Sequence, residues 1–148
     1  MKFIVVLINH YLLAFLSICL LLTCLSTAEA QIPDAVLKSF KNKYPNEKVH
    51  DWEKDAHNYI EIQFKKDGDQ YRADFLNDGT WIETEVSIDK DDLPKAIKKI
   101  IKETYGDRKI AEIEKVEHHS KGIFYDVEFK KKGKNLDVEF RANGEIIN

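Results

Sequence analysis

Apolar residues recur at helical spacing in two separate stretches of the chain, and each stretch predicts an amphipathic helix. The apolar positions are Val36, Phe40 and Tyr44 in the first stretch, and Ile97, Ile100, Ile101 and Tyr105 in the second. Proline suits the first position of a helix, where its missing N–H would have no partner, and Pro33 and Pro94 stand at the two expected starts. Pro45 and Gly106 stand where the helices are expected to end.

The residues after each predicted helix alternate between apolar and polar, which is typical of strands with one buried face. Asp67-Gly68, Asp78-Gly79 and Asn143-Gly144 interrupt the alternation. These dipeptides favour hairpin turns because Asn, Asp and Gly accept positive φ. Less regular strands are expected at residues 49–54 and 110–116. Each stretch therefore predicts one helix followed by about four antiparallel strands.

The two helix-and-strand segments are copies of each other. Residues 32–36 (Ile-Pro-Asp-Ala-Val) align with residues 93–97 (Leu-Pro-Lys-Ala-Ile) at an offset of 61. After an insertion at 118–121, residues 62–66 (Ile-Gln-Phe-Lys-Lys) align with residues 127–131 (Val-Glu-Phe-Lys-Lys) at an offset of 65. Repetition at a fixed period indicates a repeat architecture. The sequence predicts an α+β fold of two tandem repeats, residues 31–88 and 89–148.

The alternation also assigns side chains to two faces of the sheet. Each helical stripe can cover only one face, so the other is expected to remain open. The covered face of the first repeat is predicted to hold Ile60, Ile62, Phe64, Tyr71, Ala73, Phe75 and Ile82, with Phe129 equivalent to Phe64. The open face is predicted to hold Tyr59, Glu61, Gln63, Gln70, Arg72, Asp74, Trp81, Glu83 and Glu85, and in the second repeat Phe124, Asp126, Glu128, Asn135, Asp137, Glu139 and Arg141.

The first thirty residues have the layout of a secretory signal peptide. Lys2 precedes an apolar stretch, and the segment closes on Thr27-Ala28-Glu29-Ala30, whose small residues suit a peptidase site. Cleavage after Ala30 is predicted, which gives a periplasmic or secreted protein beginning at Gln31. An uncleaved anchor is disfavoured because Asn9-His10 interrupts the apolar run. A lipoprotein is disfavoured because Cys19 and Cys24 follow Ile18 and Thr23 rather than small residues.

Removal of this leader changes the chemistry of the chain but not its charge. Both cysteines are lost, so the mature chain is expected to fold without disulfides. The net charge stays at −3, because the leader carries only Lys2 and Glu29. With the two signs interspersed, neither a nucleic-acid partner nor a membrane partner after cleavage is expected. The lysine runs at 65–66 and 130–132 are interpreted as solvated hairpin ends.

The duplicated helix start and the glycine-punctuated hairpins resemble the PepSY-like periplasmic proteins, also described as β-lactamase-inhibitor-like and common in gut-type Bacteroidetes. The resemblance extends over the whole mature chain. It implies one curved antiparallel sheet with both helices on one face and a concave open face that meets a target protein through aromatic anchors. It supplies no catalytic residues and does not identify a target.

Candidate catalytic and metal-binding groups are sparse. The mature serines are Ser39, Ser87 and Ser120, and none stands in a nucleophile elbow or beside an evident base. The histidines lack the helical i, i+4 spacing of a zinc site. Asp67-Gly68-Asp69 and residues 89–92 fall short of a calcium loop. The prediction is a protein that is not an enzyme and that uses no cofactor and no metal.

Large aromatic residues on an otherwise polar face would form an interaction patch. The predicted partner-binding residues are Tyr59, Trp81, Phe124, Arg72 and Trp52. Two functions remain open. The first is a non-enzymatic module that binds an envelope protein or peptide through the open face, with inhibition of a protease or another hydrolase as one form of this function. The second is a small-ligand or envelope-stress protein with a pocket between the repeats. Exposed aromatics would favour the first, and a closed cavity holding Trp52 or Trp81 would favour the second.

Overall fold

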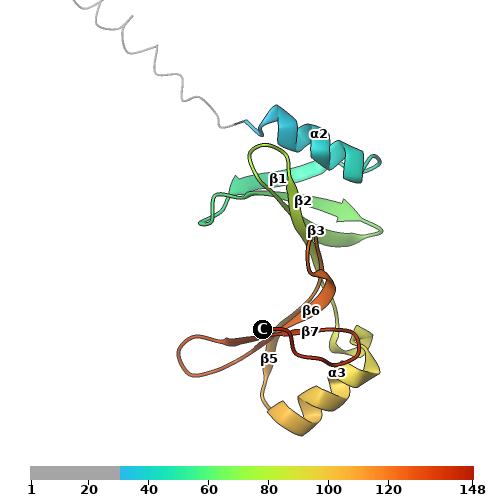
Figure 1. The fold of residues 1–148 in the computed structure, drawn as a ribbon, viewed down its shortest axis with the longest axis vertical. Helices are drawn as coiled ribbons and strands as arrows, with labels where there is room; N and C mark the ends of the chain where they lie inside the picture. Colours follow the sequence, from blue (N-terminus) through green and yellow to red (C-terminus); the bar gives the residue numbers. More distant parts are fainter. Residues whose placement is uncertain (1–30) are drawn as a thin grey trace, which may run out of the picture. The chain divides into compact units, whose positions relative to one another are not determined.

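The computed structural model describes residues 31–148, so the predicted signal peptide and its cleavage site lie outside the described residues. Figure 1 shows two helix-bearing ends joined by a continuous sheet. The first repeat comprises helix α2 (Asp34–Lys43) and strands β1 (Val49–Lys54), β2 (Ile60–Lys66), β3 (Asp69–Phe75) and β4 (Trp81–Ser87). The second comprises the short 3-10 helix η1 (Lys90–Asp92), α3 (Lys95–Ile100), the π-helical turn η2 (Ile101–Tyr105), β5 (Ile110–His118), β6 (Gly122–Phe129) and β7 (Leu136–Phe140).

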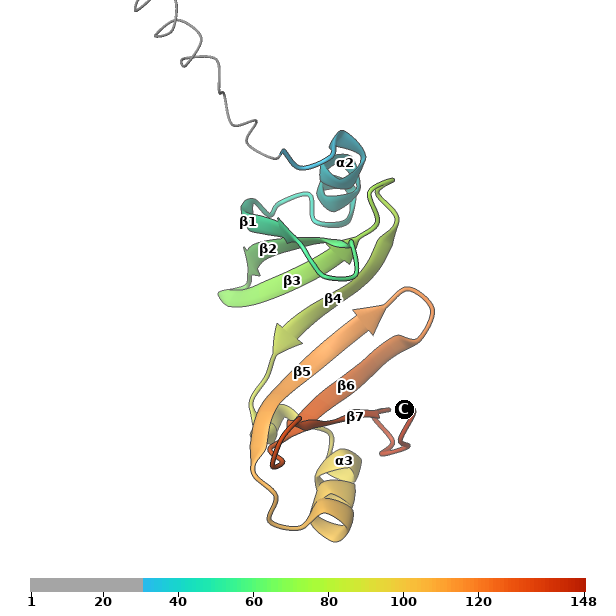
Figure 2. The same cartoon turned by 90° about the vertical axis from the view of Figure 1, so that its left-hand side faces the viewer.

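The seven strands form one antiparallel sheet in which every strand pairs with its neighbours in sequence. The two repeats join where β4 pairs with β5, as Figure 2 shows. A single bridge between Phe140 and Ile146 stands where the first repeat has its fourth strand. The α+β fold of tandem repeats, with both helices on one face of a curved antiparallel sheet, is therefore confirmed.

The two helices begin and end close to the predicted positions. Pro33 and Pro94 are the N-cap residues, so the helices begin at Asp34 and Lys95, one residue later than predicted. The second helix finishes in a π-turn, in which the Gly106 amide donates to the Ile101 carbonyl at 3.1 Å. Gly106 has a φ of +58°, which a glycine adopts without a steric penalty.

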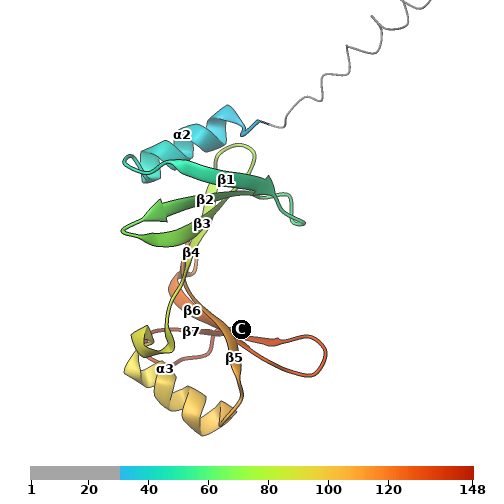
Figure 3. The ribbon, with the colours of Figure 1, turned by 180° about the vertical axis from the view of Figure 1, so that it is seen from behind.

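Each helix packs on its own hydrophobic core. In the first core, the Phe40 and Phe64 rings meet edge to face, with centroids 5.2 Å apart. In the second, the Tyr105 and Phe129 rings stack at 4.6 Å. Phe64 and Phe129 are both fully buried, as their equivalent positions predict. Figure 3 shows the two helices at opposite ends of the sheet, each over the strands of its own repeat.

Candidate partner-binding face

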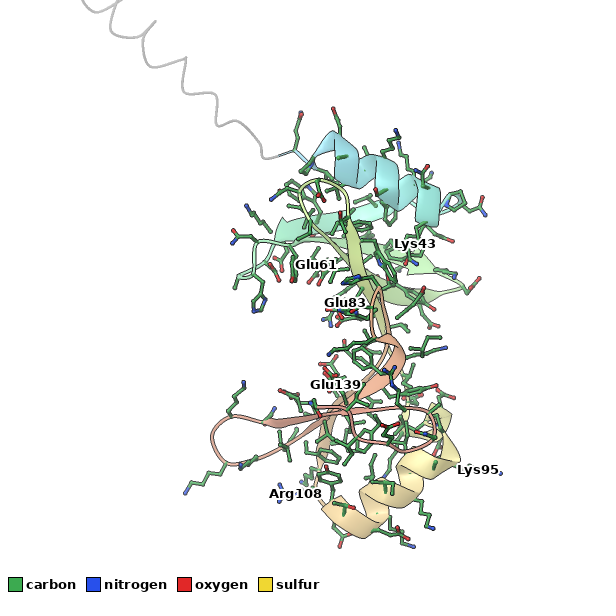
Figure 4. All side chains as sticks on the ribbon, viewed as in Figure 1. Lys43, Glu61, Glu83, Lys95, Arg108 and Glu139 are labelled. Carbon is green, nitrogen blue, oxygen red and sulfur yellow. The ribbon has the colours of Figure 1, made fainter. Side chains whose placement is uncertain are left out.

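The sheet face that points away from the helices is dominated by carboxylates. Figure 4 shows three of them, Glu61, Glu83 and Glu139, on this side of the sheet. The strand register places twelve carboxylates on it, which together are called the acidic face: Asp51, Glu53, Glu61, Asp74, Glu83, Glu85, Glu112, Glu114, Asp126, Glu128, Asp137 and Glu139.

These carboxylates stand opposite one another across neighbouring strands. In the first repeat the cross-strand row is Glu53, Glu61, Asp74 and Glu83, from β1 to β4. In the second repeat the equivalent row is Glu114, Asp126 and Glu139, from β5 to β7. A further row, Glu112, Glu128 and Asp137, lies beside it. Like charges placed directly opposite each other destabilise a sheet, so folding alone does not favour this arrangement.

The protonation behaviour of the acidic face reflects this crowding. Burial, reinforced by neighbouring carboxylates, raises the pKa of Asp74 to about 7 and that of Asp126 to about 6. Burial and the Glu85 carboxylate raise the pKa of Glu114 to about 7, against the opposing effect of Arg72. One carboxyl oxygen of Asp74 and one of Asp126 are buried without a hydrogen-bond partner. Crowding and burial therefore disfavour the ionised forms of these three carboxyl groups.

A hollow of about 140 Å³ lies in the second repeat's part of this face. Its lining consists of Glu112, Glu114, Asp126, Glu128 and Asp137. All five lining residues are acidic, so the hollow suits a cationic group. No group of three or more His, Cys, Asp or Glu side chains within residues 31–148 is arranged to hold a metal ion.

Two cations on the acidic face are held in ion pairs. The Arg72 guanidinium lies 2.7 Å from a Glu85 oxygen and also contacts Glu114, so it links strands of both repeats. The Lys121 ammonium donates to both Glu139 oxygens at 2.8 Å. Arg72 thus occupies the open face as predicted, but as a partner of two carboxylates.

The structure places two of the predicted partner-binding aromatics, Trp81 and Trp52, on the covered side of the sheet. Trp81 belongs to the covered side, because a register shift pairs Asp74 with Glu83 but Phe75 with Trp81. Its ring packs against the first core, and its Nε1–H donates to Thr84 Oγ1 at 2.9 Å. Trp52 pairs with Ile62 and also packs against that core.

Phe124 faces the open side as alternation predicts, but it is not a solvent-exposed anchor. It is 3% exposed and lies opposite Val116, which is also buried. The Lys121 ammonium lies 5.0 Å from the Phe124 ring centroid and donates to Glu139. Tyr59 is half-buried in the β1–β2 turn, where its amide donates to Asp55 Oδ1 at 2.7 Å. The structure therefore does not bring the five predicted residues together into one exposed patch.

One serine does lie beside a histidine, contrary to the sequence interpretation. Ser120 Oγ is 3.2 Å from His118 Nδ1. The same Nδ1 accepts the backbone N–H groups of Ser120 and Lys121, at 3.1 and 3.2 Å. Because this nitrogen is engaged in closing the β5–β6 turn, the pair has a structural explanation and does not form an activated nucleophile.

A second hollow spans the two repeats on the helix-bearing side of the sheet. Its volume is about 170 Å³, and Tyr71, Val86, Lys115 and Ile123 are among its lining residues. Small-molecule pockets usually measure roughly 300–1,000 Å³, so this hollow is small for a carrier protein. Trp52 and Trp81 pack on the first core and do not line it.

The acidic rows were missed from sequence, although a signal for them was present. The open-face residues could be listed by parity, but the cross-strand register was needed to show that carboxylates stand next to carboxylates. The useful signal was the duplication. Glu53 aligns with Glu114, Glu61 with Asp126, and Asp74 with Glu139, so the acidic row is repeated in both copies.

The chain matches a family model over residues 24–72 and again over residues 61–148. The family carries the description "Putative beta-lactamase-inhibitor-like, PepSY-like". The double match agrees with the tandem repeats of the fold. No curated protein matches the chain.

Several solved structures share the fold. A BLIP-like protein from Bacteroides fragilis is 22% identical, with a TM-score of 0.70 over 82% of this chain and 87% of that one. A DUF2874 family protein from Bacteroides ovatus is 17% identical, with a TM-score of 0.71 over 81% and 87%. A protein from Bacteroides eggerthii described as "putative periplasmic" is 20% identical, with a TM-score of 0.70 over 80% and 88%. Within the described part of this chain, no helix has the length and apolar character needed to cross a membrane.

Proposed function

Since this chain belongs to the PepSY-like, β-lactamase-inhibitor-like family, we propose that it is an exported, non-enzymatic binding module that docks a basic protein segment on its acidic face. The observation that carries the proposal is the acidic row present in both repeats. The family description supports the inhibitor-like type of module, and the charge of the face sets the chemistry of the partner. The aromatic anchors expected from the sequence have no part in this proposal.

Physical reasons favour a partner rich in Lys and Arg. Cross-strand carboxylates repel each other in the free protein, and a cation placed between them converts that repulsion into attraction. The hollow lined by five acidic residues suits one Lys or Arg side chain, while the remaining carboxylates steer the partner during its approach. Both terms weaken with salt, so binding is expected to be strongly salt-dependent.

The test uses an oligolysine peptide as the probe and an oligoglutamate peptide of equal length as its counterpart. Calorimetry is expected to show binding of oligolysine only. The variant E112Q/E128Q/D137N, which neutralises part of the hollow, is expected to bind at least about tenfold more weakly, since each close charge pair contributes up to ~1 kcal/mol.

The matched control is D91N/E103Q/D107N, which changes the net charge equally at exposed residues outside the acidic face. It is expected to keep the wild-type affinity to within about twofold. Equal loss in both variants would show that net charge, and not the acidic face, attracts the peptide. The inhibitor aspect has its own assay, the hydrolysis of a chromogenic cephalosporin by a β-lactamase with and without this protein. Inhibition that E112Q/E128Q/D137N abolishes is the expected result for an inhibitor acting through this face.

A further inference from the structure

The connection between β6 and β7 carries a concentrated positive charge. Lys130, Lys131, Lys132 and Lys134 lie in this hairpin, and all four are exposed. Two more cations, Arg108 and Lys109, lie beside the hairpin in the loop before β5. The Lys130 N–H donates to the Lys109 carbonyl at 2.8 Å, which brings this loop next to the hairpin. These six residues are called the lysine hairpin. Among the ion pairs found within residues 31–148, none involves any of them.

The first repeat shows that the fold does not require this charge. The positions aligned with the lysine hairpin are Glu47, Lys48, Lys65, Lys66, Asp67 and Asp69, in which three cations face three anions. Each turn has a glycine at positive φ, +99° at Gly68 and +93° at Gly133, but β2 and β3 are joined by two residues and β6 and β7 by six. Glu47, Asp67 and Asp69 correspond to Arg108, Lys132 and Lys134, so the second repeat carries a cation at all six positions, although the exposed Asp107 stands beside Arg108.

The lysine hairpin also stands apart from the acidic face. Figures 1 and 3 show the β6–β7 connection projecting beyond the rest of the second repeat, and Figure 4 shows Arg108 near its base. Glu128 is the nearest member of the acidic face along β6, about 7 Å in extended chain from Lys130 at the start of the hairpin. Lys132 at the tip follows Glu128 by four residues, about 13 Å in extended chain. That separation exceeds the Debye length of roughly 8 Å at physiological salt. Salt therefore screens the repulsion between the acidic face and an anionic surface that touches the tip.

We propose that the lysine hairpin docks this protein on an anionic phospholipid surface. Its tip offers flexible ammonium groups, which act as point charges and match a fluid array of phosphates. Residues 130–135 contain no aromatic side chain on which a nucleobase could stack. Acidic and basic residues are interspersed along the sequence, which argues against membrane contact. In the folded protein, however, they are separated into an acidic face and a basic hairpin tip. Docked by this tip, the protein keeps its acidic face free for a basic partner.

The experiment measures partitioning onto vesicles by co-sedimentation, with processed protein whose mass shows that the leader is absent. Vesicles of phosphatidylglycerol mixed with phosphatidylcholine are compared with pure phosphatidylcholine. Partitioning is expected on the anionic vesicles only and is expected to fall with salt. The variant K132D/K134D restores the charges of the first repeat's turn. It is expected to partition at least tenfold more weakly, since each basic residue near an anionic surface contributes about fivefold.

The matched control is K65D/K66D, which makes the same charge change in the equivalent hairpin and is expected to partition nearly as well as the wild type. E112Q/E128Q/D137N is also expected to partition normally, so failure of the basic-partner proposal would not affect this one. Absent binding to anionic vesicles, or equal loss in K65D/K66D, overturns the proposal. Self-association without lipid that K132D/K134D abolishes also overturns the proposal, because the hairpin would then bind a second copy of the protein. Binding to duplex DNA that depends on the hairpin and exceeds binding to the vesicles overturns it as well.

Discussion

Asp74 illustrates, at the scale of one residue, what the acidic face costs the fold. Its carboxylate stands between Glu61 and Glu83 on neighbouring strands, and one of its oxygens is buried without a partner. Asp74→Asn removes the charge and supplies an amide that can donate to those neighbours. We expect the variant to be more stable above pH 7 by about 1 kcal/mol, a figure reduced for the partial exposure of the group.

Thermal melts of Asp74→Asn and wild type above pH 7 test this expectation. Asp69→Asn, at an exposed turn position on the same strand, is the control and is expected to stay within about 0.5 kcal/mol of the wild type. A less stable Asp74→Asn would mean that the carboxylate makes a favourable interaction that its geometry does not reveal.

Replacement of Trp81, unlike that of Asp74, is expected to destabilise the protein. The indole packs on the first core, donates to Thr84, and lies beneath the Lys43 ammonium at 3.5 Å. Trp81→Ala is therefore expected to lower the free energy of unfolding by about 3 kcal/mol or more, measured by denaturant titration. Leu76→Ala, at an exposed residue of the same hairpin, is expected to cost less than about 1 kcal/mol. If both variants melt alike, Trp81 is not part of the core.

The contrast between Trp81 and Phe64 shows where sequence reasoning succeeds for single side chains. Period-two alternation placed Phe64 correctly because β2 and β3 pair without interruption. It failed for Trp81 because one irregularity after Asp74 reverses the parity at the start of β4. Phe124 shows a different limit. Its face was predicted correctly, but parity carries no information on the long side chains, such as Lys121, that lie over a residue.

At the scale of elements, the β3–β4 hairpin is pressed against the first helix at a glycine. A Cβ on Gly79 would lie 2.5 Å from the Ala35 carbonyl oxygen, and φ there is +87°. The equivalent Gly144 is less confined, with its nearest atom, Ile100 Cγ1, at 3.2 Å. Gly68 has a similar φ of +99° but nothing within 4 Å of its Cβ position.

These contacts rank three alanine substitutions. Gly68→Ala is expected to cost about 1–2 kcal/mol, the strain of a positive φ alone. Gly144→Ala is expected to cost more, and Gly79→Ala most, because the helix must also move away from the turn. Denaturant titrations of the three variants provide the ranking. A Gly79→Ala variant no less stable than Gly68→Ala would contradict this close approach of helix and turn.

The elements themselves were largely predictable because the signals for them are local. Proline before a helix, glycine after it and Asp-Gly between strands act on the backbone of their own neighbourhood. The π-turn at 101–105 and the reduction of the last strand to one bridge were not predicted. Both depend on how the second repeat packs, which the alternation of apolar and polar residues does not specify.

At the scale of the whole molecule, two cores share one sheet. The Lys43–Glu117 and Arg72–Glu114 ion pairs cross between the repeats, in addition to the β4–β5 pairing. Phe64→Ala and Phe129→Ala are each expected to cost about 3–5 kcal/mol, and each is expected to melt in one transition because the sheet couples the repeats. Glu61→Ala is the control and is expected to show no loss. A second, separate transition in either variant would show that the repeats unfold independently.

The pH dependence of stability and of binding should have opposite signs in this molecule. The raised pKa values of Asp74, Glu114 and Asp126 mean that the folded chain holds protons that the unfolded chain releases. Stability should therefore fall as pH rises from about 4 to about 7, and it should recover on acidification through the same window. His118, whose pKa is lowered by burial, opposes this trend. Asp55 and Asp78, whose pKa values are lowered by hydrogen bonds in their turns, oppose it at the acid end of the range.

A basic ligand reverses that slope, because it binds the ionised carboxylates. The increase in Tm that oligolysine produces should therefore grow as pH rises from about 5 to about 7, while the Tm of the free protein declines. Melting curves recorded across this range with and without the peptide measure both slopes in one experiment. In D74N/E114Q/D126N both slopes should flatten together, since the same carboxylates set them. If the wild-type Tm changed with pH in parallel with and without the peptide, the titrating carboxyl groups would not belong to the surface that binds the peptide. That result would contradict the proposed docking site.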